Sequence, residues 1–106
     1  MGLLVMVAYR PRVGMEQRLL ELVKEHVPRL RHEQLATDRD PLVMRAGDGT
    51  LIEVFEWQSA DAIHTAHANA AVQAMWEQFG AACEYETLAN LPECQGLFAT
   101  FEPVEL

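Results

Sequence analysis

The acidic residue in the least expected position is Glu53. It lies in residues 50–57, which we predict to be a strand whose successive side chains point to opposite faces. Its neighbours on one face of that segment are apolar: Leu51, Phe55 and Trp57. A carboxylate held among apolar side chains is suited to exchanging a proton with a bound ligand. A structural ion pair with Arg10 or Arg45 explains the same position equally well, so both interpretations stay open.

Two histidines, His64 and His67, lie three residues apart on the helix expected after this strand. That spacing places both on one side of the helix, but a metal ion needs a third and a fourth ligand. No HExxH or carboxylate pattern supplies them, and we expect no metal site. His67 alone is a candidate acid, base or pocket donor, because imidazole changes charge near neutral pH. The alternative is a surface or core-edge histidine that is satisfied by a local hydrogen bond.

Aromatic side chains form a third group of candidates. In a small domain they contribute either the wall of a ligand pocket or ordinary core, and both interpretations remain open. The residues concerned are Tyr9, Trp57, Trp76, Phe79 and Tyr85.

Apolar runs and alternation mark the strands that position these residues. We predict strands at residues 3–9, 42–45, 50–57, 82–88 and 97–101. The glycines within residues 46–49 permit the tight connection of a hairpin between the second and third strands. A turn or a single helical turn is expected at residues 90–94, around Pro92.

Two stretches have helical periodicity. The first begins at Met15, and Pro28 is expected to kink it or end its regular part, before a loop over residues 31–40. The second begins at Ser59, a good N-cap. Asn69 is expected to divide this second stretch, which then ends at Gly80.

The resulting order of elements predicts one α+β domain over residues 1–106, a ferredoxin-like antiparallel sheet with helices on one face. Apolar side chains occupy both faces of residues 50–57, so a single copy leaves one face of the sheet uncovered. We therefore expect a homodimer in which two sheets face one another.

The charged residues narrow the choice of partner. Eight Lys and Arg against sixteen Asp and Glu give a net charge of −8, which disfavours nucleic acid. All eight basic residues lie within residues 1–45. This uneven distribution either serves only solubility or brings the basic half into contact with the acidic half, within the chain or across a dimer.

The apolar and cysteine content indicates the compartment. No apolar run reaches the roughly 20 residues that span a bilayer, and residues 1–8 lack the features of a secretory signal. We expect a cytoplasmic protein without a membrane partner. Cys83 and Cys94 lack metal-ligand spacing, and in a reducing compartment both are expected to be free thiols.

The chain resembles the dimeric α/β-barrel superfamily, in particular its antibiotic-biosynthesis-monooxygenase-like branch. The resemblance rests on residues 53–57, Ser59, Ala62, His67 and Trp76, and on the order of elements over nearly the whole chain. It implies a dimeric barrel and a pocket between sheet and helices, lined by a histidine of the second helix and a neighbouring tryptophan. It also implies no cofactor, because monooxygenases of this branch work without metal or flavin. The superfamily is functionally mixed, so it indicates the fold better than the function.

Residues and resemblance together predict a cofactor-independent, monooxygenase-like enzyme that acts on a planar or aromatic small molecule. The candidate catalytic residues are His67 and Glu53. The candidate substrate-binding residues are Tyr9, Trp57, His64 and Trp76. The alternative is a non-catalytic ligand-binding or stress-associated dimer. A cavity that is reachable from His67 distinguishes an enzyme from a dimer filled with packed side chains.

Overall fold

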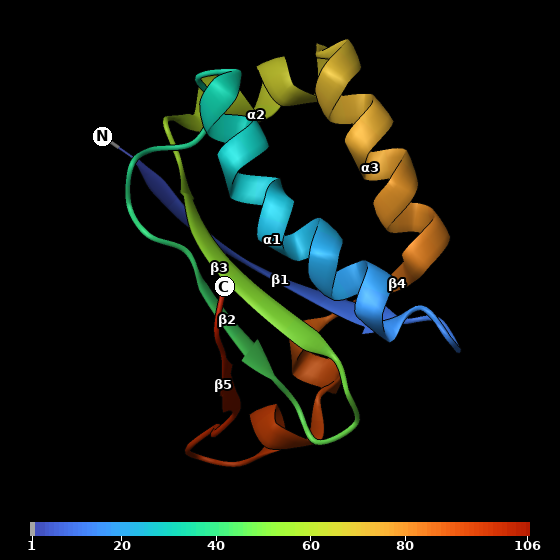
Figure 1. Cartoon of the computed structure of the whole chain (residues 1–106). Helices are drawn as coiled ribbons and strands as arrows, with labels where there is room; N and C mark the ends of the chain where they lie inside the picture. Colours follow the sequence, from blue (N-terminus) through green and yellow to red (C-terminus); the bar gives the residue numbers. More distant parts are fainter. Residues whose placement is uncertain (1) are drawn as a thin grey trace.

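The sheet is built around β1 (Leu3–Pro11) and β3 (Leu51–Trp57), which pair in antiparallel register. The computed structural model describes residues 2–106 and has the strand order β4-β1-β3-β2-β5, with every pair antiparallel. The other elements are α1 (Glu16–His32), β2 (Leu42–Arg45), α2 (Ala60–Ala68), α3 (Ala70–Ala82), β4 (Cys83–Glu86), the short 3₁₀ turns η1 (Leu88–Asn90) and η2 (Pro92–Gln95), and β5 (Glu102–Val104). The three helices lie together on one side of the sheet (Figure 1). This α+β architecture is compatible with the predicted ferredoxin-like fold.

Alternation along the two central strands gives the sheet two faces with different surroundings. Val7 lies opposite Glu53, and both point to the face that α1 and α3 cover. Ala8 lies opposite Ile52 on the other face, where both are buried in a second, smaller cluster. The predicted alternation in β3 is therefore confirmed, and it places Glu53 on the face under the helices.

One apolar stripe holds α1 on the sheet. Its buried residues recur at three- and four-residue spacing: Leu19, Leu22, Val23, His26, Val27 and Leu30. The helix continues through Pro28 to His32, so the prediction that its regular part ends at the proline is wrong. Val27 and Leu30, on either side of the proline, are both buried. Their packing holds the helical turn in place although one backbone hydrogen bond is missing.

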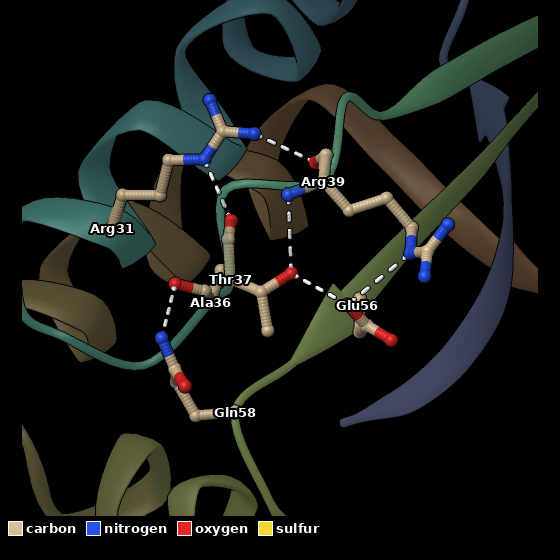
Figure 2. A network of polar contacts seen from close by, with 6 residues as sticks. All are labelled: Arg31, Ala36, Thr37, Arg39, Glu56 and Gln58. Carbon is tan, nitrogen blue, oxygen red and sulfur yellow. Dashed lines mark hydrogen bonds and ion pairs between the residues drawn. The ribbon is translucent and has the colours of Figure 1, made fainter. Parts of the chain in front are cut away.

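A polar network ties the segment after α1 to the end of β3 (Figure 2). Arg31 donates hydrogen bonds to the carbonyl oxygens of Thr37 and Arg39, at 2.8 and 2.6 Å. Glu56 accepts from the Thr37 hydroxyl at 2.7 Å and from the Arg39 guanidinium at 3.2 Å. These contacts, that of Thr37 foremost, lower the pKa of Glu56. The network fixes the predicted loop across the strand end that carries Trp57.

Two side-chain caps divide the second helical stretch. Ser59 Oγ accepts from the backbone N–H of Ala62 at 3.1 Å, and Asn69 Oδ1 accepts from that of Val72 at 3.0 Å. Asn69 thus separates α2 from α3, as predicted. Its amide also donates to Glu33 Oε1 at 2.8 Å, which ties the break to the end of α1.

The C-terminal quarter differs most from the prediction. The final strand is β5 rather than residues 97–101, and α3 runs two residues beyond Gly80. Leu97 and Phe98, which the predicted strand contained, are exposed. Pairing explains the difference, because the outer edge of β2 is open and Val104 pairs with it. The predicted single turn around Pro92 is confirmed as η2.

The segment between β4 and β5 covers one end of the sheet face that the helices leave open (Figure 1). Leu91 is fully buried there, in a cluster with Ala8 and Ile52. The other end of this face remains exposed, at 63% for Leu4, 49% for Met6 and 56% for Leu42. The expectation of an uncovered sheet face therefore holds for that end only.

Ion pairs join the basic and the acidic halves within the chain. Arg10 pairs with Glu86, Arg12 with Glu84 at 3.2 Å, and a third pair involves Arg39 in the loop described above. These arginines flank α1 instead of lying on it. Within residues 2–106, no helix has the length and the apolar character to cross a membrane.

Trp57→Ala should lower the free energy of unfolding by about 3–5 kcal/mol, because Trp57 is only 6% exposed and its removal leaves a cavity in the main core. His67→Ala removes an exposed side chain and should change it by less than about 0.5 kcal/mol. Urea denaturation of both variants beside the wild type measures the difference. Equal destabilisation by the two substitutions would contradict this account of the core.

Candidate functional site

Glu53 is the centre of a buried chain of polar side chains. It is fully buried, and its Oε1 accepts hydrogen bonds from the Tyr9 hydroxyl at 2.7 Å and from His26 Nδ1 at 2.8 Å. On the other side of the imidazole, Trp76 Nε1 donates to His26 Nε2 at 3.2 Å. β1, β3, α1 and α3 each supply one member. The packing of the helices on the sheet therefore assembles the chain.

The directions of these bonds fix where His26 carries its proton. An indole N–H can only donate, so Nε2 of His26 accepts from Trp76 and carries no proton. Nδ1 must then carry the ring proton and donate it to Glu53 Oε1. His26 is thus a neutral imidazole whose tautomer and orientation are set from both sides.

The carboxylate of Glu53 is satisfied through one oxygen only. Its Oε2 is buried and has no hydrogen-bond partner among residues 2–106. Arg10 extends to the opposite face of β1 from Tyr9 and pairs with Glu86, and Arg45 forms no ion pair with Glu53. The structural ion pair with either arginine is therefore wrong. A buried carboxylate with an unsatisfied oxygen is unusual in a core and is typical of functional sites.

His26 forms part of the wall of a pocket of about 340 Å³ between the sheet and the helices. The aromatic residues of the wall are Tyr9, Phe55, Trp57, Trp76 and Tyr85, and a second imidazole comes from His67. Burial raises the pKa of Tyr85, so its hydroxyl is neutral at pH 7. The volume falls within the range of small-molecule sites. The aromatic lining suits a flat, apolar ligand that presents its polar edge to an imidazole.

His67 reaches this pocket from α2. Its Nδ1 lies 2.8 Å from the carbonyl oxygen of Ile63, which can only accept, so Nδ1 donates and Nε2 is left as an acceptor. Its ring meets that of Trp76 edge-on, with centroids 5.1 Å apart. Both interpretations of His67 therefore describe part of what is seen, since the side chain makes a local hydrogen bond and also lines the pocket.

The structure brings together most of the predicted site residues. Those that line the pocket are His67, Tyr9, Trp57 and Trp76. Glu53 lies behind the wall and contacts it through His26. His64 is exposed and is not among the lining residues, so the pocket gives it no binding role. Phe79, from the aromatic set, is core and packs against Tyr9 with ring centroids 5.1 Å apart.

His26 is the candidate residue that sequence reasoning missed. It falls on the apolar stripe of α1, four residues after Leu22 and four before Leu30. A histidine at a core position of an amphipathic helix needs a buried polar partner. Glu53 was an unpaired carboxylate at a core position of a strand. These two anomalies together were the signal from which the contact was predictable.

The remaining candidates for metal binding or nucleophilic chemistry lie outside the pocket. Residues 2–106 contain no group of three or more His, Cys, Asp or Glu side chains arranged to hold a metal ion. Cys83 and Cys94 are both free. Burial raises the pKa of the Cys83 thiol to about 11, which makes it a poor nucleophile at neutral pH.

No protein-family model, no curated protein and no solved structure matches this chain.

Tyr9 provides a test of this polar chain at alkaline pH. Burial, and then the negative charge of Glu53, raise the pKa of Tyr9 well above its ordinary value of about 10. Above pH 10 the unfolded chain loses the phenolic proton while the folded chain keeps it, so stability falls as the pH rises. The free energy of unfolding of the wild type should therefore fall with pH more steeply than that of Tyr9→Phe, by up to about 1.4 kcal/mol per pH unit. Urea denaturation over this range measures both slopes. Identical slopes would show that Tyr9 ionises freely in the folded state.

Proposed function

We propose that this protein is a cofactor-independent, monooxygenase-like enzyme that acts on a planar aromatic small molecule. The observation that carries the proposal is the His26–Glu53 pair, joined at 2.8 Å, in the wall of an aromatic pocket of about 340 Å³. A carboxylate behind a neutral imidazole orients it, and stabilises the imidazolium that forms when the outer nitrogen takes a proton. In this proposal His26 is the base, and the pocket beside it holds the flat ligand.

The base in this proposal is His26 and not His67. Glu53 was expected to exchange a proton with the ligand itself, and in this proposal it acts instead through His26, as a positioning and charge-stabilising group. His67 is exposed and forms the outer part of the pocket wall, so we assign it to substrate binding, with Trp57 and Trp76 as the flat surfaces.

The proposed reaction begins with proton transfer. A ring hydroxyl of the substrate gives its proton to His26 Nε2, and the resulting electron-rich anion reacts with O₂ at a ring C–H that is conjugated to the hydroxyl. One oxygen atom becomes a carbonyl oxygen at that carbon and the former hydroxyl becomes a second carbonyl, while the other oxygen atom leaves as water with the hydroxyl proton and the C–H hydrogen. Substrate and O₂ thus balance in atoms and electrons, and the reaction needs no external reductant.

A non-catalytic ligand-binding dimer is the second candidate function. The observation that favours it is the hydrogen bond from Trp76 to His26 Nε2, which occupies the nitrogen that a base requires. In that case the same pocket holds a ligand without changing it. The two functions differ in oxygen consumption.

Glu53→Gln is the decisive variant, because glutamine has nearly the same shape and its carbonyl oxygen can still accept from Tyr9 and His26. It removes the negative charge that stabilises an imidazolium and places an amide NH₂ at the buried position of Oε2. We expect kcat/KM for O₂ consumption with quinols and polyphenols to fall at least about 100-fold, with little change in KM. An oxygen electrode, without added metal or flavin, measures this.

Two comparisons complete the test. His64→Ala, which alters an exposed residue of α2 outside the pocket, should retain wild-type turnover. Binding of the same compounds to the wild type without any O₂ uptake would identify the protein as a binder and would reject the enzyme proposal.

We also propose that two copies pair through the open end of the sheet. Leu42, Val54 and Met6 form one row across three strands, because Leu42 lies opposite Val54 and Val54 lies opposite Met6. Two of the three are about half exposed, and Leu4 beside them is 63% exposed. A contiguous apolar area of this kind is normally covered. A second copy offers the same row and covers it symmetrically.

Light scattering after size exclusion should therefore report about twice the chain mass of 11.9 kDa. Met6→Lys places a charge within the apolar row and should shift the protein towards the monomer. Val13→Lys is the matched control, because Val13 is equally apolar and fully exposed but lies in the loop between β1 and α1. A monomeric wild type at micromolar concentration would exclude this pairing.

A further inference from the structure

We infer that Trp76 is a positioning residue that holds His26 Nε2 until a ligand with an O–H or N–H donor takes its place. The inference rests on the proposed function, because it names the class of molecule that the same pocket selects. Such a ligand donates to His26, whereas an ether or a ketone of the same shape cannot.

Both ring nitrogens of His26 have a hydrogen-bond partner in the free protein. Its Nδ1 proton is committed to Glu53 and its Nε2 lone pair to Trp76, so neither ring nitrogen is free. The imidazole is only 3% exposed, and water cannot readily replace a lost partner. A ligand therefore reaches Nε2 only by displacing the indole N–H.

The replacement must itself be a donor. If a group that only accepts displaced Trp76, it would leave Nε2 buried and unsatisfied, and that loss weakens binding roughly 5- to 150-fold. A hydroxyl or an N–H on an aromatic ring restores the bond and brings its proton to the nitrogen that the proposed reaction uses. Trp76 thus occupies His26 Nε2 in the free protein, and binding of a substrate with a donor group makes this nitrogen available as the base.

The burial of the four side chains shows which member of the polar chain can move. Tyr9, Glu53 and His26 are buried, at 2%, 0% and 3% exposure, whereas Trp76 is only partly buried. The other neighbour of the indole is His67, an exposed side chain on a different helix, with ring centroids 5.1 Å apart. The outer wall formed by Trp76 and His67 is therefore the part of the pocket with room to rearrange.

The experiment is to detect the Trp76–His26 bond by NMR and to titrate the protein with two matched probes. The chain has two tryptophans, so the spectrum of ¹⁵N-labelled protein shows two indole N–H signals, which Trp76→Phe assigns. In the free protein the Trp76 signal should show scalar coupling through the N–H···N bond to His26. The signal of Trp57 should not, and it serves as the internal reference.

The probes are 2-naphthol and 2-methoxynaphthalene, which differ by the methyl group that removes the donor. We expect 2-naphthol to bind at least about fivefold more tightly and to abolish the coupling. In Trp76→Phe neither probe displaces a protein donor, and only 2-naphthol gives Nε2 a new bond, so the preference for 2-naphthol over the ether should remain at least about fivefold. The ratio of the two affinities cancels the loss of indole surface, which affects both probes alike.

Four results would overturn the inference. The first two are no coupling in the free protein and a coupling that survives saturation with 2-naphthol. The others are loss of the preference for 2-naphthol in Trp76→Phe, which would show that the hydroxyl does not bond to His26, and failure of 2-naphthol to bind the wild type. If the donor preference and the loss of coupling are observed but no compound supports O₂ uptake, only the enzymatic part of the proposed function fails.

Discussion

A carboxylate without access to water, in the middle of the sheet, is the interaction on which the rest of this structure depends. Burying a charge costs several kcal/mol unless hydrogen bonds replace its water. Glu53 obtains two such bonds, from Tyr9 on the neighbouring strand and from His26 on α1. The apolar stripe of α1 explains why the helix covers the sheet. The bond to Glu53 specifies where along the sheet it lies, because a shift of one turn would break the bond from His26 and leave the carboxylate with Tyr9 alone.

The inner end of the polar chain is rigid and its outer end is not. The imidazole of His26 lies edge-on to Phe55 and Phe79, with ring centroids 5.2 and 5.0 Å apart, and Tyr9 packs on Phe79. These rings exclude water, which strengthens each hydrogen bond inside the cluster. At the outer end the chain reaches Trp76, which is partly exposed. With this asymmetry His26 stays oriented while the outer wall of the pocket, at Trp76, has room to adjust.

Sequence reasoning succeeded where the signal is local. The alternation in β3 predicted the burial of Glu53, and the cap at Asn69 depends only on its own side chain and the next turn. It failed where the deciding contact is distant in sequence. The final strand is selected by the open edge of β2, and the continuation of α1 past Pro28 depends on tertiary packing. His26 was missed because a histidine is counted as polar and because its partner, Glu53, lies 27 residues away in sequence, on the strand that α1 covers.

The break at Asn69 connects the architecture to the proposed behaviour of the pocket. An uninterrupted helix would place His67 and Trp76 on one rod, nine residues apart, and they would then face different directions. The break lets α2 and α3 run in different directions. The ring centroids of His67 and Trp76 therefore lie 5.1 Å apart, and the two rings form one wall of the pocket. α3 is anchored to the main core through Met75 and Phe79, whereas α2 buries only Ala62 and Ala66. Movement in α2 therefore disturbs little of the core, and substitutions there can change which ligand the pocket accepts without loosening the chain that orients His26.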